Sequence, residues 1–160
     1  MNKKIITGLN PIYNNNCKVL LLGSFPSVAS RNANMYYSHP QNRFWKVLSK
    51  ILNYPFPQTN SQKINMLLEN NIALWDVVHS CSIINSQDAT IKDVSPNNLN
   101  IIINKNPNIK IFTLGKTATK LLNVYTILTS TYLPSTSPAN CAINEQELIN
   151  AFSKILNYIK

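Results

Sequence analysis

The chain contains few cysteine, glycine, arginine and acidic residues, and it has no long apolar run. Its cysteines, Cys17, Cys81 and Cys141, lie far apart and form no C-x-x-C pair, which excludes a zinc ribbon and a four-cysteine iron–sulfur cluster. No apolar stretch approaches the ~20 residues needed to span a bilayer. The basic N-terminus lacks the apolar region and cleavage site of a signal peptide. We therefore expect a soluble, cytoplasmic protein with free thiols and no membrane attachment.

The charge is strongly unbalanced, with 15 Lys and Arg against 6 Asp and Glu and a formal net charge of +9. Such an excess favours a polyanionic partner, because cationic side chains that contact phosphates release condensed counterions. Compositional drift is the alternative, since a chain rich in Asn, Ile and Lys, as AT-rich coding produces, also has a high pI. The two arginines, Arg31 and Arg43, both fall in the same short segment.

The 160 residues fit one domain spanning 1–160. Apolar runs predict four buried strands, and patterns with helical spacing lie between and after them. Strands that alternate with helices predict an α/β fold, a three-layer α/β/α sandwich with a central, mostly parallel four-stranded sheet. The expected strands are Cys17–Gly23, Ile72–Val78, Ile109–Gly115 and Tyr125–Leu133. The expected helices are 41–52, 61–70, 96–104, 116–123 and a last helix near the C-terminus. Pro40 is expected in the first turn of the first of these helices, and Ser95 is expected to cap the helix at 96–104. Asn144 and Glu147 are expected to cap the last helix.

Ligands of such folds bind beyond the carboxyl ends of the strands. The loop after the first strand begins at Gly23, which lets the backbone approach a ligand closely. The hydroxyls of Ser27 and Ser30 and the neighbouring amides can bind a phosphate or a base edge, although the same pattern also occurs in simple turns.

Aromatic and polar side chains gather in the next segment, 35–45. Aromatic rings stack on splayed bases, while amides and arginine read base edges or hold phosphate. We assign Phe44 and Trp45 to the core. The spacing from His39 favours Tyr37 over Tyr36 as the tyrosine that faces a pocket.

The motif Gly23-Ser24-Phe25-Pro26-Ser27, followed by Tyr36-Tyr37-x-x-Pro40-x-Asn42-x-Phe44-Trp45, resembles the hypoxanthine-DNA glycosylase branch of the uracil-DNA glycosylase superfamily. The resemblance continues through residues 73–81 and 135–140. It implies that Asn42 is catalytic. The mismatch-specific thymine/uracil branch has an asparagine at the position of Phe25, which argues against that branch. After the second strand, Ile83 and Asn85 replace the family's Arg and Gly, while Ser86 and Asp88 remain.

The resemblance implies a monofunctional glycosylase that excises hypoxanthine from deoxyinosine. Uracil could also be accepted, because both bases have a carbonyl beside a ring N–H. In this hypothesis Tyr37 (or Phe25) stacks on the flipped base, and the amides near Ser24 and Phe25 stabilise the departing anion. Asn42 orients the attacking water through its amide oxygen. The reaction requires no metal or other cofactor and no lysine nucleophile.

The expected partner is double-stranded or single-stranded DNA that contains a damaged base, bound by a monomer. Gly115-Lys116-Thr117 is not a P-loop, because Lys110 stands where that motif requires glycine. Asp76 and Asp88 could stabilise a sugar cation or cap a turn, with the cap favoured for Asp76, and His79 is assigned a structural role. A mismatch-specific uracil or thymine glycosylase and a non-catalytic nucleic-acid-binding module remain alternatives. The residues expected to contact DNA are Ser27, Ser30, Arg43, Lys116, Ser135, Ser137, Pro138 and Asn140.

Overall fold

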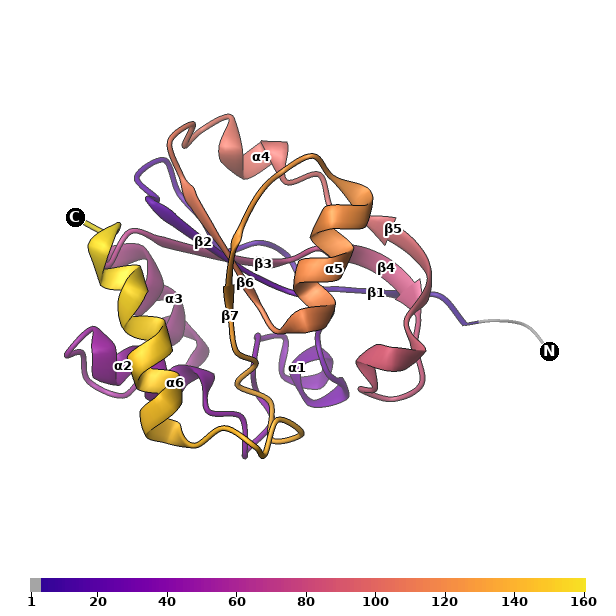
Figure 1. The fold of residues 1–160 in the computed structure, drawn as a ribbon, viewed down its shortest axis with the longest axis horizontal. Coiled ribbons are helices and arrows are strands. Elements are labelled where there is room, and N and C mark those ends of the chain that lie inside the picture. Colours follow the sequence, from indigo (N-terminus) through magenta and orange to yellow (C-terminus); the bar gives the residue numbers. More distant parts are fainter. Residues whose placement is uncertain (1–3) are drawn as a thin grey trace.

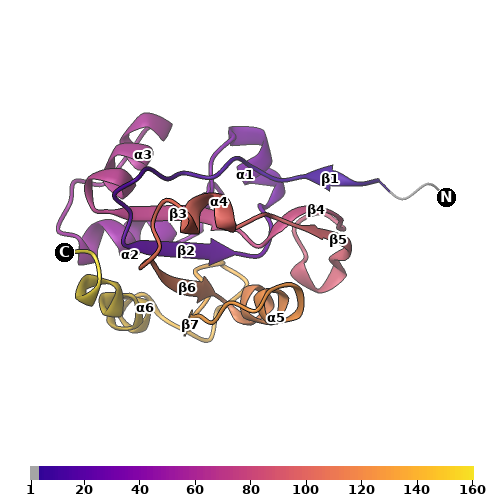
Figure 2. The same cartoon turned by 90° about the horizontal axis from the view of Figure 1, so that it is seen from above.

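The computed structural model describes residues 4–160 and centres on a parallel sheet with the strand order β3-β2-β6-β7 (Figure 2). Every residue of β2 and β3 is buried, as expected for apolar strands covered on both faces. The predicted α/β fold with a four-stranded parallel sheet is confirmed. Residues 1–3 of the basic N-terminus lie outside the described residues. The strands are β2 (Val19–Gly23), β3 (Ile72–Asp76), β6 (Lys110–Leu114) and β7 (Thr131–Leu133).

Helices lie on both sides of this sheet (Figure 1). The helices α2 (Phe44–Ile51), α3 (Asn60–Glu69) and α6 (Glu145–Phe152) gather on one side, and α4 (Asn100–Ile103) lies on the other. The helix α5 (Lys116–Tyr125) follows β6 directly, and a 3₁₀ segment, η2 (Ser153–Asn157), continues α6.

The predicted capping box of α6 is confirmed. The side chain of Asn144 accepts a hydrogen bond of 2.8 Å from the Glu147 N–H, and the Glu147 carboxylate accepts one of 3.2 Å from the Asn144 N–H. Two of the four orphan donors at the helix start are thereby satisfied.

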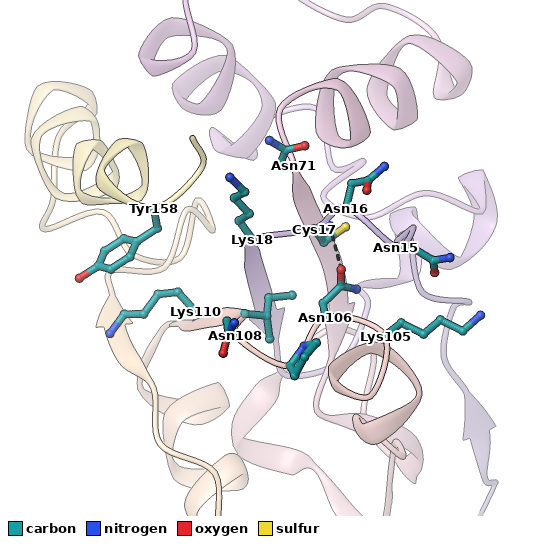
Figure 3. Close-up of a pocket in the computed structure, with 12 residues that line it drawn as sticks. Asn15, Asn16, Cys17, Lys18, Asn71, Lys105, Asn106, Asn108, Lys110 and Tyr158 are labelled. Carbon is teal, nitrogen blue, oxygen red and sulfur yellow. Dashed lines mark hydrogen bonds between the residues drawn. The ribbon is translucent and has the colours of Figure 1, made fainter.

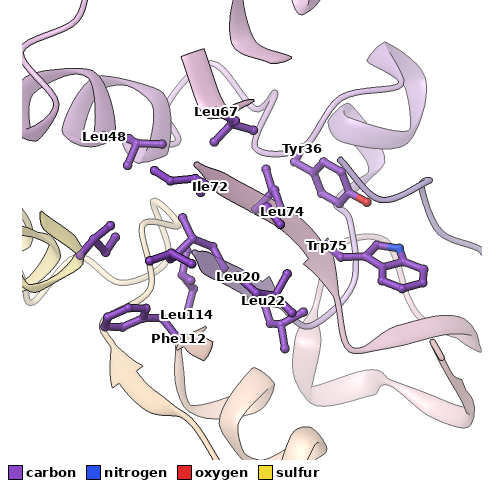
Figure 4. Packing of buried hydrophobic residues seen from close by; sticks show 14 of the residues in the cluster. Leu20, Leu22, Tyr36, Leu48, Leu67, Ile72, Leu74, Trp75, Phe112 and Leu114 are labelled. Carbon is purple, nitrogen blue, oxygen red and sulfur yellow. The ribbon is translucent and has the colours of Figure 1, made fainter. Parts of the chain in front are cut away.

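The main core forms between the sheet and its helices (Figure 4). Leu20, Leu22, Leu74 and Phe112 of the strands and Leu48 of α2 all belong to this buried cluster. The register places Leu74 and Phe112 beside Leu21 on one face of the sheet, whereas Leu20 and Leu22 lie on the other face. Phe44 and Trp45 are 0% and 3% exposed, so their assignment to the core is confirmed.

A second, antiparallel sheet was not predicted. It has the order β1-β4-β5 and consists of β1 (Ile6–Thr7), β4 (Val78–Ser82) and β5 (Lys92–Pro96), with the 3₁₀ turn η1 (Asp88–Thr90) before β5. Only Val78 and Cys81 of β4 are buried, and no residue of β5 is. These strands therefore lack the continuous apolar run that marked β2 and β3.

Several predicted boundaries were wrong. The chain forms a turn at Pro40, and α2 begins at Phe44 rather than at residue 41. Pro96 ends β5, and Ser95 caps no helix, because α4 begins at Asn100. Tyr125 ends α5, which leaves only residues 131–133 in the fourth strand. The loop after β2 contains a short helix, α1 (Val28–Ala33), that was not predicted.

Within residues 4–160, no helix combines the length and the apolar character that a membrane-crossing segment requires.

Candidate active site

The carboxyl end of β2 is the centre of the candidate site. Gly23 pairs with Asp76 at the end of β3. A Cβ atom on Gly23 would lie 2.5 Å from Oδ1 of Asp76 and 2.8 Å from the hydroxyl of Tyr37. Only glycine fits here, because the backbone and both polar groups converge on the space that a side chain would fill.

The two polar groups beside Gly23 have unsatisfied atoms. Within residues 4–160, the Tyr37 hydroxyl and Oδ2 of Asp76 are buried and have no hydrogen-bond partner. Buried polar atoms are nearly always paired, so an unpaired couple marks a place where a ligand can supply the partner. The expected turn cap at Asp76 is therefore wrong: its carboxyl faces the site. The sequence signal for this role is an acidic residue at the end of an otherwise apolar strand.

The surroundings of Asp76 and Tyr37 favour their neutral forms. Burial, together with the nearby charge of Asp88, raises the pKa of Asp76 to about 8. Burial also raises the pKa of Tyr37 well above its ordinary value. At neutral pH the Asp76 carboxyl is mostly protonated, so it can donate one hydrogen bond and accept others.

Tyr37 is held in an unusual backbone conformation. Its φ angle is 54°, in the left-handed region that bulky residues seldom adopt. Its ring stacks on Phe44 at a centroid distance of 4.2 Å and an interplanar angle of 26°. Tyr36 turns away, donating from its hydroxyl to the Asn10 carbonyl over 2.6 Å. Tyr37 is therefore the tyrosine at the strand end, and its hydroxyl rather than a free ring face points at Gly23.

The loop after Gly23 presents unpaired backbone donors. Among residues 4–160, the N–H groups of Ser24 and Phe25 form no hydrogen bond. The Ser24 hydroxyl donates to Asp88 over 3.0 Å. The Phe25 ring is only 7% exposed, in a small cluster with Val78 and Cys81, and therefore offers no open face to a base.

The serines of this loop support α1. Ser27 caps the helix by accepting a 3.1 Å hydrogen bond from the Ser30 N–H. Ser30 is 2% exposed, and its hydroxyl accepts a further bond from the Ser38 N–H. Ser27 keeps partial exposure, whereas Ser30 lies beneath the surface that we expected it to present to DNA.

Asn42 links two segments through its side-chain oxygen. Oδ1 accepts a hydrogen bond of 2.9 Å from the Phe44 N–H at the start of α2 and one of 2.8 Å from the hydroxyl of Thr136. Thr136 is buried, so this contact brings the loop after β7 to the start of α2.

Arg43 strengthens the same connection. Its guanidinium donates to the carbonyl oxygens of Ser137, Asn140 and Ile143 at 3.1, 3.0 and 2.6 Å. These bonds make Arg43 a clamp on the loop, and a direct contact with DNA stays a prediction.

The loop after β7 is braced internally. The Ser135 hydroxyl accepts from the Ser137 N–H, that of Ser137 accepts from the Ala139 N–H, and the Asn140 amide donates to the Ser135 carbonyl. Pro138 lies partly exposed at the turn. Because both hydroxyls act here as acceptors, their O–H groups remain able to donate to a phosphate.

Gly115 and Lys116 adjoin this loop. Gly115 has φ 92°, and a Cβ there would lie 3.2 Å from Cβ of Ser135. Lys116 is the first residue of α5 and is exposed at the same edge of the sheet.

The replacement of the family's Gly by Asn85 has a structural explanation. Asn85 adopts φ 54°, a conformation that asparagine tolerates better than other residues with a side chain. Its carbonyl oxygen accepts a hydrogen bond of 3.1 Å from the guanidinium of Arg31 in α1. Ile83, in place of the family's Arg, packs on the small cluster around Val78.

Other chemical groups lie apart from this site. His79 is exposed on β4. Within residues 4–160, no three His, Cys, Asp or Glu side chains come close enough to hold a metal ion. A pocket of about 460 Å³ lies at the opposite edge of the sheet, where Lys18, Lys105 and Lys110 surround Cys17 and Asn106 (Figure 3). It adjoins the amino ends of parallel strands, where ligands of such folds seldom bind.

Comparisons with known proteins agree with this geometry. The family model described as "Uracil DNA glycosylase superfamily" matches residues 11–160. A solution NMR structure of a candidate uracil DNA glycosylase from Methanosarcina acetivorans is similar with a TM-score of 0.77 and 29% identity, covering 96% of this chain and 99% of that one.

Two curated relatives carry a more specific name, hypoxanthine DNA glycosylase. The protein of Methanosarcina barkeri is 34% identical over 105 residues, which cover 65% of this chain and 66% of the relative. That of Methanosarcina acetivorans is 33% identical over 87 residues, which cover 54% of this chain and 55% of the relative. The chain therefore matches just under two thirds of the first relative's length and about half of the second's.

Proposed function

This chain belongs to the uracil DNA glycosylase superfamily, and we propose that it is a monofunctional DNA glycosylase whose main substrate is deoxyinosine. The observation that carries the proposal is the unpaired couple beside Gly23, the Tyr37 hydroxyl and the Asp76 carboxyl. The relatives named hypoxanthine DNA glycosylase support the choice of base.

The base would enter with its lactam edge toward this couple. Hypoxanthine has a ring N–H beside a carbonyl, so it both donates and accepts. A protonated Asp76 carboxyl matches that pattern, and the Tyr37 hydroxyl adds a further donor. Uracil has the same pair of groups and is the expected second substrate.

Leaving-group stabilisation comes from the backbone. Cleavage of the glycosidic bond transfers its electron pair to the base and leaves positive charge on the sugar. The free N–H groups of Ser24 and Phe25 would hydrogen-bond the base as it becomes an anion. A single donor of this kind is typically worth about 3 kcal/mol in the transition state.

Asn42 would orient the water that attacks the sugar carbon. A carbonyl-type oxygen has two lone pairs, and both are occupied in this structure by Phe44 and Thr136. The Thr136 hydroxyl can rotate, so the water would take its place on the Asn42 oxygen. The water oxygen then bonds to the sugar carbon, one water proton passes to the departing base anion, directly or through solvent, and an abasic site remains without strand cleavage.

The DNA backbone would lie along the loops at this edge of the sheet. The proposed contacts are the hydroxyls of Ser135 and Ser137, the exposed Pro138, the Asn140 region and the ammonium group of Lys116. Flipping the nucleotide costs a few kcal/mol, and the cost is lowest for a damaged or mispaired base.

The test uses duplexes that contain inosine, uracil or G·T at one position, followed by alkali to cleave abasic sites. We expect cleavage with inosine first and with uracil more slowly. DNA binding without any base release would favour a non-catalytic binding module. Release of thymine from G·T in preference to inosine would favour the mismatch-specific branch.

A further inference from the structure

A groove lies between α5 and the edge strand β7, next to the proposed DNA surface. Its volume is about 450 Å³, within the usual range for ligand sites. One face of α5 and a single residue of β7 line it, and Figure 2 shows these two elements side by side. The lining residues are Lys116, Thr119, Lys120, Asn123, Val124 and Tyr132.

The charge of this groove is positive and not neutralised. Lys116 and Lys120 are exposed and lie one helical turn apart, about 6 Å along the axis. No Asp or Glu occurs between Asp93 and Glu145 in the sequence. Across the part of the chain that the structure describes, neither lysine forms an ion pair. A cationic groove of this kind attracts phosphate.

The groove also has an aromatic surface. Tyr132 is 43% exposed at the middle of β7, and Val124 beside it is 63% exposed. Aromatic rings next to lysines are the usual means of binding unpaired nucleotides, because any base can stack on the ring.

The groove continues the proposed DNA surface. From Tyr132 the chain reaches Ser135 in three residues, about 10 Å at the rise of an extended strand. At the other end, Lys116 follows Gly115, whose backbone packs against Ser135. A strand that leaves the loop at residues 135–140 can therefore enter the groove directly.

We infer that this groove binds an unpaired nucleotide of the substrate strand, a few positions from the excised base. The base stacks on Tyr132, and Lys116 and Lys120 contact the adjoining phosphates. The inference rests on the proposed function and adds to it a preference for lesions that are flanked by single-stranded DNA.

The experiment compares a short inosine duplex with the same duplex carrying a single-stranded extension of several nucleotides, placed on either strand end in turn. Wild-type protein is expected to bind one extended form about 10-fold more tightly than the short duplex. Tyr132→Ala and Lys120→Gln should abolish this gain and leave affinity for the short duplex unchanged.

Matched controls are Tyr125→Ala, an equally exposed tyrosine outside the groove, and Lys105→Gln at the opposite edge of the sheet. Both should keep the gain, and thermal melting should show all four variants folded. Two results would overturn the inference about the groove and leave the proposed function intact. One is normal base release with no gain in affinity from either extension, and the other is a gain in affinity that survives Tyr132→Ala. Absence of base release from every substrate would instead overturn the proposed function.

Discussion

Asn42 serves two purposes through one atom. Its oxygen holds the first turn of α2 by the Phe44 N–H and the loop after β7 by Thr136. The proposed mechanism needs an asparagine that is oriented before substrate arrives, which is the condition for effective positioning of a water, and these two hydrogen bonds orient Asn42. The same contacts mean that a substitution here disturbs structure as well as chemistry, so the two effects must be separated.

The first prediction therefore compares three variants. Asn42→Ala should lower single-turnover release of hypoxanthine about 100-fold or more, because the water is no longer positioned. Thr136→Val removes the same loop contact but leaves the amide, and should retain activity within about 10-fold. Asn42→Asp keeps an oxygen for both donors, so substantial activity in this variant would assign the water to the oxygen rather than to the amide nitrogen. Equal losses in Asn42→Ala and Thr136→Val would show that the loop contact alone explains the defect.

The second prediction concerns pH. The pKa of Asp76 is raised to about 8, mainly by burial. Below pH 8 the carboxyl is neutral and can donate to the base carbonyl. Above pH 8 it becomes an anion beside a leaving group that is itself becoming negative. We expect kcat/KM for inosine to fall about tenfold per pH unit above pH 8, as a single controlling ionisation requires.

Asp76→Asn supplies the check on this assignment. The amide keeps a donor and an acceptor but does not titrate, so its profile should be flat between pH 7 and pH 9. Glu145→Gln, at a surface carboxylate that pairs with Lys46 and Lys50, should keep the wild-type profile. An unchanged decline above pH 8 in Asp76→Asn would assign the titration to another group.

At the scale of elements, the site depends on how the loop after β7 is attached to α2. Arg43 donates to three carbonyl oxygens of that loop, so its planar, forked guanidinium is matched to the arrangement. Lysine has the same charge but only one donor group. Charge and geometry can therefore be separated at this position.

The third prediction uses this difference. Arg43→Lys should weaken binding of inosine DNA and lower the Tm by several degrees, since hydrogen bonds to a charged group contribute about 1.5–3 kcal/mol. Hydrogen exchange should become faster in residues 135–143. If Arg43 acted only as a charge facing phosphate, Arg43→Lys would bind DNA nearly as well as wild type, and that result would refute the clamp.

The same elements show what the sequence can and cannot predict. The strands β2 and β3 were predictable because both faces are buried, and the capping box at Asn144 involves groups only three residues apart. The strands β4 and β5 were missed because little of either is buried. Their formation depends on pairing with each other and with β1.

The candidate site divides in the same way. The strand-end rule located the loop at Gly23, and the motif pointed to Asn42. The carbonyl oxygens that Arg43 binds lie about 100 residues further along the chain. The burial of the Asp76 carboxyl and its lack of a hydrogen-bond partner depend on the tertiary packing of the segments around it. No local pattern contains that information.

At the scale of the whole molecule, the net charge of +9 does not by itself locate the DNA surface. Lysines line both edges of the sheet. Lys116 lies at the carboxyl edge beside the candidate site, while Lys18, Lys105 and Lys110 surround the pocket at the amino edge (Figure 3). Compositional drift could account for lysines at either edge, so the salt dependence of binding has to be measured residue by residue.

The last prediction makes that measurement. For duplex DNA, the slope of log K against log salt is about −0.9 for each phosphate contact. Lys116→Gln should therefore reduce the steepness of the slope by about 0.9 on inosine duplex and on undamaged duplex alike, because a phosphate contact is independent of sequence. Lys105→Gln has the same loss of charge, but its side chain lies at the opposite edge, over the ring of Tyr13, and should leave the slope unchanged. Equal changes in the salt-dependence slope of the two variants would mean that the overall charge attracts DNA. That result would refute the carboxyl edge as the DNA-binding surface.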